Sequence, residues 1–138
     1  MKFREISPPR NFEVSGGGLK LLLSDCGRVS LDVNEQVTFT TESGAEYDVT
    51  RKDWGFYATP STNGRLSSFG LRAALVRNLR GRLFVVLVES GKEEEFRNYT
   101  ISDKQIFITW LDSDDAVENL CSCLHFTAIQ QKEILNEN

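Results

Sequence analysis

Histidine is nearly absent from the 138 residues of this chain, since His125 is the only one. Metal sites that need two or more imidazole ligands are therefore excluded. We interpret His125, which lies in an apolar helical pattern near the C-terminus, as a partly exposed helix residue and not as a catalytic acid or base. The sequence predicts neither a bound metal nor a cofactor.

Cysteine and long apolar runs are also scarce. The three cysteines are Cys26, Cys121 and Cys123, and an odd number suits reduced thiols better than a disulfide framework. The longest apolar run, residues 83–88, is far shorter than the roughly 20 residues of a transmembrane helix. Residues 1–11 contain no apolar segment of the kind a signal peptide needs. We therefore expect a soluble, cytoplasmic protein without membrane contact.

Familiar catalytic motifs are missing too. The glycine-rich stretch at 15–20, SGGGLK, lacks the spacing of a phosphate-binding P-loop, and we interpret it as a linker. No G-x-S-x-G elbow for serine hydrolysis is present. The sequence indicates no particular reaction, so we favour a non-catalytic function and assign no catalytic residue.

What is present suits a single domain over residues 1–138. Hydrophobic residues make up 40% of the chain and charged residues 26%, shares that are typical of a globular protein with a real core. Residues 1–18, which contain prolines and a run of glycines, are predicted to be a loose lead. Residues 129–138 are predicted to be a frayed tail.

Short stretches in which apolar and polar residues alternate predict strands with one solvent-exposed face, as in 37–40, where Val and Phe alternate with Thr. Turn-like joints such as 25–28 separate these stretches, and Pro60 should end one of them because it cannot donate to a ladder. Residues 83–88 are apolar at every position, which predicts a central strand covered on both faces. The expected strands are 19–23, 29–33, 37–40, 47–50, 54–59, 69–76, 83–88 and 106–111, mostly antiparallel.

Two helices are expected towards the C-terminus. The rhythm changes over 90–99, which predicts a short helix on the sheet. Residues 113–115, Ser-Asp-Asp, are suited to the N-cap and first turn of a second helix. The fold class is therefore α+β, with a mostly antiparallel sheet and one or two helices packed on it. The apolar face of the second helix is formed by Val117, Leu120, Leu124 and Ala128.

Positive charge is concentrated in residues 51–82, where seven Lys or Arg residues stand against a single Asp. This segment carries +6, so the rest of the chain carries −10. The same segment holds the connection 59–68, which at ten residues is longer than the two to five of most hairpin loops. Long polar loops are often functional.

These features predict a small binding domain for an anionic, ring-bearing ligand such as a nucleotide, a sugar nucleotide or an acidic sugar. Guanidinium groups match the geometry of phosphate and carboxylate, and an aromatic ring stacks on a base or sugar. The net charge of −4 argues against non-specific binding to nucleic acid. The predicted ligand-binding residues are Tyr57, Asn63, Arg65 and Arg72.

Three alternatives stay open. A metal-dependent nuclease would use Glu89 and Lys92 at the end of a core strand, with Asp48 as a conceivable second carboxylate. A transferase or isomerase would use Asp53 and Tyr57 as acid and base. A structural or protein-interaction subunit would need no such site.

The cations of 51–82 have a plainer interpretation as well, because they could face the chain's own acidic segments, 93–95 or 112–115. Self-association is a further expectation. The apolar strands 19–23 and 83–88 could extend a sheet into a homo-oligomer.

Overall fold

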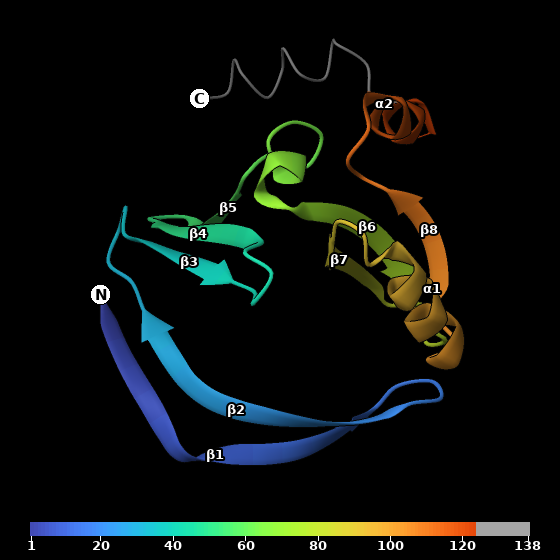
Figure 1. The fold of residues 1–138 in the computed structure, drawn as a ribbon. Coiled ribbons are helices and arrows are strands. Elements are labelled where there is room, and N and C mark those ends of the chain that lie inside the picture. Colours follow the sequence, from blue (N-terminus) through green and yellow to red (C-terminus); the bar gives the residue numbers. More distant parts are fainter. Residues whose placement is uncertain (124–138) are drawn as a thin grey trace.

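The computed structural model describes residues 1–123, whose strands pair antiparallel in three separate sheets (Figure 1). Two α-helices follow the strand-rich part, so the predicted α+β class is confirmed. The predicted tail, together with Leu124, His125 and Ala128, lies outside the described residues. The sheets are β1 (Lys2–Ser15) with β2 (Lys20–Ser30); β3 (Gln36–Thr40), β4 (Glu46–Lys52) and β5 (Gly55–Thr59); and β7 (Leu83–Glu89), β6 (Leu71–Arg77) and β8 (Ile106–Trp110). The helices are the 3-10 helix η1 (Leu66–Phe69), α1 (Glu93–Ser102) and α2 (Asp114–Cys123).

The N-terminal residues form a long curved hairpin, β1–β2, which we call the arm (Figure 1). Most of the lead predicted at 1–18 is therefore strand, and only its glycines form the turn. The turn expected at 25–28 is also wrong, because β2 runs through it without a break. Gly27 fits there because a side chain at this position would meet the ring of Phe3, 2.7 Å away.

The prolines of the arm coincide with its one irregularity. The register between β1 and β2 shifts between Glu5 and Arg10, and Pro8 and Pro9 lie inside that interval. A proline cannot donate a ladder hydrogen bond, so the strand bulges here and does not end.

The second sheet follows the predicted alternation. Val37 pairs with Val49, and Phe39 pairs with Tyr47, which places these four side chains on one face. Tyr57 pairs with Thr50 and lies on the opposite, polar face of the sheet. The strand before Pro60 ends at Thr59, as predicted.

The third sheet corrects one expectation. The apolar run 83–88 forms β7, an edge strand, and β6 is the central one. Leu83 and Val85 are each 60% exposed, whereas Ala73, Ala74 and Val76 of β6 are fully buried. An apolar run predicts that the strand's surface is buried, but it does not show whether residues of the same chain bury it.

The core beside this sheet is small. It is built around Leu66 of η1, whose side chain has no exposed surface. Gly70 ends η1 at φ 76°, and a side chain there would lie 3.4 Å from Ala45. Within residues 1–123, the buried apolar residues apart from Pro60 are Ala45, Leu66, Leu71, Ala73, Ala74, Val76 and Val88.

The two α-helices begin close to the predicted places. In α1, Phe96 packs on Phe107 and Trp110 of β8, with ring centroids 6.5 and 5.9 Å apart, so this helix lies on the third sheet. The hydroxyl of Ser113 accepts a hydrogen bond of 3.1 Å from the amide of Ala116 and caps α2 as expected. Neither helix is long and apolar enough to cross a membrane.

Candidate functional site

The long connection 59–68 is folded on itself rather than open to a ligand. The carbonyl of Ser61 accepts hydrogen bonds from the amides of Gly64 (3.3 Å) and Leu66 (3.0 Å). The hydroxyl of Ser61 accepts a third, from the amide of Arg65, at 3.2 Å. These bonds form a compact turn that delivers Leu66 into the core, which gives the extra length of the connection a structural purpose.

The predicted ligand-binding residues of this region make contacts within the chain. The amide of Asn63 donates to Asp114 at the start of α2, at 3.1 Å. The guanidinium of Arg65 lies 5.5 Å from the ring centre of Phe69. Tyr57 is half exposed on the polar face of the second sheet. Their role in binding stays a prediction, but nothing in the geometry joins these three to Arg72.

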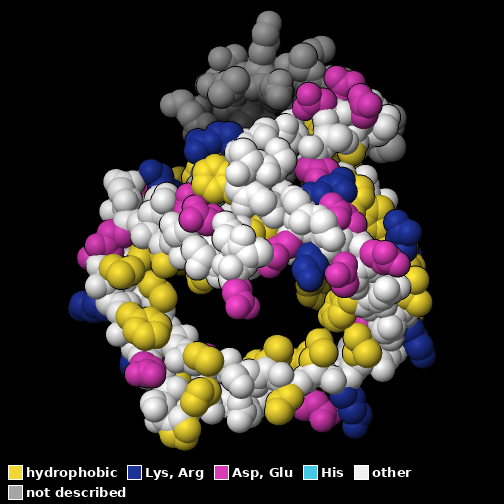
Figure 2. All heavy atoms as spheres, in the orientation of Figure 1, with side chains coloured by type: hydrophobic (Ala, Val, Ile, Leu, Met, Phe, Trp, Pro, Cys, Tyr) yellow, Lys and Arg dark blue, Asp and Glu magenta, His cyan; other side chains and the backbone are white. Residues whose placement is uncertain are grey.

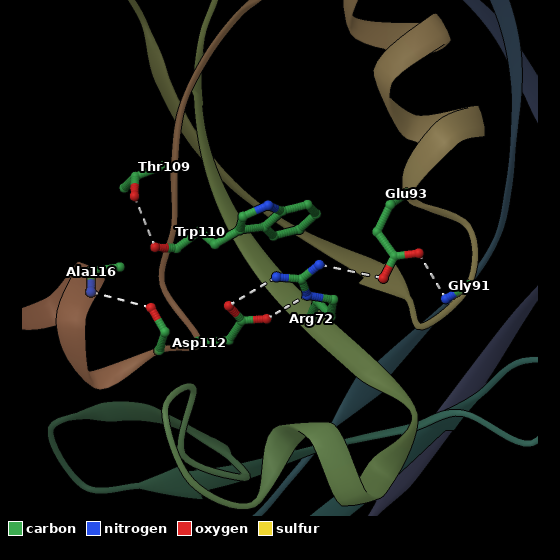
Figure 3. Close-up of polar contacts among 8 residues, drawn as sticks. Arg72, Gly91, Glu93, Thr109, Trp110, Asp112 and Ala116 are labelled. Carbon is green, nitrogen blue, oxygen red and sulfur yellow. Dashed lines mark hydrogen bonds and ion pairs between the residues drawn. The ribbon is translucent and has the colours of Figure 1, made fainter.

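Arg72 is held by two carboxylates and an indole (Figure 3). Its Nε donates to Asp112 at 2.7 Å and its Nη2 to the other oxygen of Asp112 at 3.4 Å. Its Nη1 lies 3.4 Å from Glu93. The guanidinium also stacks on Trp110, with its carbon 3.8 Å from the ring centre. A bidentate pair with a stacked ring holds the plane of the guanidinium in one orientation.

The electrostatics of this group agree with its geometry. The hydrogen bond to Asp112 raises the pKa of Arg72, against the effect of burial. The pKa of Glu93 is lowered, first by a hydrogen bond to its own backbone amide and then by Arg72 and the amide of Gly91. Both groups therefore carry their charges at neutral pH.

A pocket of about 210 Å³ opens between α1 and the third sheet, beside Arg72 and its partners. We call it the α1 pocket. Its walls combine aromatic rings with charged side chains from β6, α1 and β8. The lining residues are Arg72, Glu93, Phe96, Arg97, Thr100, Phe107 and Trp110.

Among the four predicted site residues, Arg72 is the one that lines this pocket. Arg97 and the three rings were missed at the level of sequence, because residues 90–99 and 106–111 were used only to predict a helix and a strand. One signal was available. Phe96 and Arg97 are adjacent on a helix that had to lie against the strand ending in Trp110.

The plainer interpretation of the positive segment is right for Arg72 alone. Its partners, Glu93 and Asp112, come from the two acidic segments expected to face it. The other six cations of 51–82 form no ion pair with any described carboxylate. Arg51, like Arg65, lies over a neighbouring ring, with its guanidinium carbon 5.9 Å from the centre of Phe56.

Glu89 and Lys92 of the nuclease alternative line a second, more open hollow, to which Asp48 does not contribute. Glu89 accepts a hydrogen bond of 2.6 Å from Ser43, which is the main reason that its pKa is lowered. Lys92 lies 3.6 Å from Glu95. Asp48 accepts a hydrogen bond from Thr38 in the second sheet. Within residues 1–123, no three His, Cys, Asp or Glu side chains are grouped closely enough to hold a metal ion, and no observation favours this alternative.

Comparisons with known proteins add no functional assignment, because no family model, curated protein or solved structure matches the chain. The geometry of the described residues therefore carries the functional argument.

Proposed function

We propose that the protein is a small, non-catalytic binding domain whose α1 pocket accepts one ring of an anionic ligand. The observation that carries the proposal is the meeting of three aromatic rings and two guanidinium groups in one pocket. This keeps the ligand class expected from the sequence, and it keeps Arg72. It replaces Tyr57, Asn63 and Arg65 by side chains of α1 and β8.

The rings form a wall that an aromatic or sugar ring can pack against. Phe107 and Trp110 lie edge to face, with centroids 5.3 Å apart, and Phe96 is tilted against Trp110. Phe107 remains 42% exposed, so this cluster is not closed by the protein's own side chains. Stacking of one ring on such a wall contributes about 1–3 kcal/mol.

One cation of the pocket remains for an anion. Two arginines and one glutamate line it, and Asp112 beside it pairs with Arg72, so Arg97 is the cation that the described carboxylates leave for a ligand. Arg97 is exposed and forms no ion pair with a described carboxylate. The contact of Arg72 with Glu93 is long at 3.4 Å, so an incoming phosphate or carboxylate could take over Nη1 while Asp112 keeps the guanidinium in place.

The size of the pocket limits the ligand. A cavity of about 150 Å³ holds a benzene ring, and the α1 pocket measures about 210 Å³. One substituted ring therefore fits, and the anionic group and any further part of the ligand lie at the exposed rim beside Arg97.

The test uses Trp110 as its reporter. Trp54 is 68% exposed and lies outside the pocket, so Trp54→Phe leaves Trp110 as the sole tryptophan. In this background we expect at least one compound of a panel of nucleoside monophosphates, sugar nucleotides and aromatic carboxylates to change the Trp110 fluorescence saturably. The matched neutral nucleosides and amides should bind at least about tenfold more weakly, since they cannot pair with Arg97.

The matched variants are Arg97→Gln, inside the pocket, and Arg82→Gln, an exposed cation outside it. Arg97→Gln should weaken binding of the anion by about tenfold or more, and Arg82→Gln should leave the affinity unchanged. A panel without any saturable response, or equal losses in both variants, would contradict the proposal.

We also propose that the protein acts in the cytoplasm. Cys26 and Cys121 are free and exposed, a state that a reducing compartment maintains. Labelling of both thiols in freshly lysed cells by a maleimide is the expected result, and thiols found oxidised there would argue for another location.

A further inference from the structure

The described chain exposes more surface than a compact monomer does. A folded monomer of 15.6 kDa exposes about 7,300 Å² by the usual scaling with mass, whereas this chain exposes 10,475 Å². Residues 124–138 could account for at most about 2,600 Å², the limit for a fully extended segment of their mass. The remaining residues then still expose about 1,300 Å² more than a compact chain of their size.

Part of this surface is apolar and lies on one face of the arm. Cross-strand partners and residues two apart share a face of a hairpin. Phe12 pairs with Leu23, and Phe3 pairs with Val29, so all four lie on the same face. They are between 39% and 64% exposed.

The arm is attached to the rest of the molecule at its two ends. At the open end, the terminal amine lies 2.6 Å from Glu35. At the turn, Asp103 accepts hydrogen bonds from the amides of Gly17 and Leu19. Between these ends Figure 2 shows an opening through the molecule, whose rim along the arm is largely apolar. A two-stranded ribbon is marginally stable without such a face packed on something.

A second apolar surface lies on the edge strand β7. Leu83 and Val85 point to the same face, and both are 60% exposed. Phe84, on the other face, is 48% exposed. Within the described residues, β7 pairs on one side only, with β6. Within residues 1–123, two apolar surfaces are therefore left largely exposed, the arm face and the β7 edge.

We propose that a second copy of this chain covers both surfaces. In a twofold dimer, the apolar face of each arm packs on the Leu83–Val85 stretch of the other chain, so one contact made twice covers all four surfaces. If this contact covers the excess of about 1,300 Å² on each chain, it buries about 2,600 Å² in total, within the range of obligate homodimers and above that of transient complexes. The inference is independent of the ligand pocket.

The small core explains why the occupant is another copy and not an occasional partner. Only seven apolar residues besides Pro60 are buried within the described part of the chain. A cover on which folding depends must be present wherever the chain is present and in equal amount, and a second copy meets this condition by itself.

The test compares a substitution on each proposed contact surface with a matched substitution outside it. Leu23→Asp places a charge on the arm face, and Leu22→Asp places the same charge on the opposite face, where Leu22 is 73% exposed. Val85→Asp on β7 is paired in the same way with Leu79→Asp, in the turn that precedes the strand.

By sedimentation, the wild-type chain should be a dimer whose melting temperature rises with protein concentration. Leu23→Asp and Val85→Asp should weaken dimerisation by about tenfold or more, while Leu22→Asp and Leu79→Asp leave it unchanged. A wild-type chain that stays monomeric at about 100 μM, with a melting temperature independent of concentration, overturns the proposal. Equal losses from the matched substitutions overturn the assigned surfaces.

If Leu23→Asp does not fold, cross-linking of the wild-type chain decides. Copies labelled with light and heavy nitrogen are mixed, refolded together and cross-linked, so that links between copies differ in mass from links within one. Mixed-label links between the arm and the third sheet are expected. Their absence, with links formed only within single copies, overturns the proposal as well.

Discussion

Asp103 holds the turn of the arm, and its replacement by alanine is expected to lower the free energy of unfolding by about 3 kcal/mol. The side chain is 8% exposed. It accepts hydrogen bonds from the amides of Gly17 (3.2 Å) and Leu19 (3.4 Å) and from the side-chain amide of Gln105 (2.8 Å). A well-formed hydrogen bond to a charged group contributes about 1.5–3 kcal/mol, and we count the two long bonds at about 1 kcal/mol or less each.

The matched variant is Asp103→Asn, which should cost only about 1 kcal/mol. Its oxygen can still accept from the two amides of the arm turn. Its NH₂ group would face Gln105, whose Oε1 is buried without a hydrogen-bond partner among the described residues. A flip of the Gln105 amide would let that oxygen accept from the new NH₂, so asparagine preserves most of the contacts.

Urea unfolding at one fixed protein concentration measures both variants, and fixing the concentration removes any contribution from association. The alanine variant should melt about 10 °C below the wild type. Trypsin should also cleave it faster at Arg10 and Lys20, because the arm turn is released. An alanine variant within about 0.5 kcal/mol of the wild type would refute the assigned role of Asp103.

The same carboxylate gives this effect a pH dependence. Burial alone would raise the pKa of Asp103, but the hydrogen bonds from Gln105 and from the amides of Leu19 and Gly17 lower it below its ordinary value of 3.8. A lowered pKa stabilises the folded state above the ordinary value, and this stabilisation is lost as the pH falls through the folded-state pKa. The gap between wild type and Asp103→Ala should therefore be full near pH 6 and close only below about pH 4.

Two further predictions concern the core and the ion pair between Arg72 and Asp112. Leu66→Ala should lower the free energy of unfolding by about 2–5 kcal/mol, because it empties a fully buried site; the exposed Leu79→Ala is its control, and equal effects in urea unfolding would contradict the account of the 59–68 connection. A double-mutant cycle of Arg72→Met and Asp112→Asn should give a coupling energy of about 1–2 kcal/mol, reduced from the value of a buried pair because Arg72 is 31% exposed; additive losses would show that the stacking on Trp110, and not the ion pair, fixes Arg72.

Local sequence patterns correctly predict the elements whose conformation depends mainly on residues close in the sequence. The alternation of 37–40, the stop at Pro60 and the cap at Ser113 were confirmed because each depends on neighbours within a few residues. At Gly27 the local pattern gave a wrong prediction. A glycine suggests a turn, but this one accommodates the ring of Phe3, which is 24 positions away in the sequence.

The apolar run 83–88 misled for a different reason. Burial on both faces of a strand requires cover from elsewhere, and a sequence of continuous apolar residues records the need for that cover but not its source. In this chain β7 is at an edge, with Leu83 and Val85 largely exposed. If a second copy supplies the cover, the prediction of a doubly covered strand describes the dimer and not the single chain.

Arg72 shows that a count of charges along the sequence has the same limitation, because it does not identify which cations are paired within the chain. A count over 51–82 correctly finds an excess of cations, but it treats them as one group. Arg72 pairs with Asp112, 40 positions away, and that pairing depends on β6 and β8 being neighbours in the sheet. Arg97 lies outside the positive segment, yet it lines the α1 pocket together with Arg72. Strand neighbours and helix placement, which a count cannot contain, decide which cation faces a ligand and which one is already neutralised within the chain.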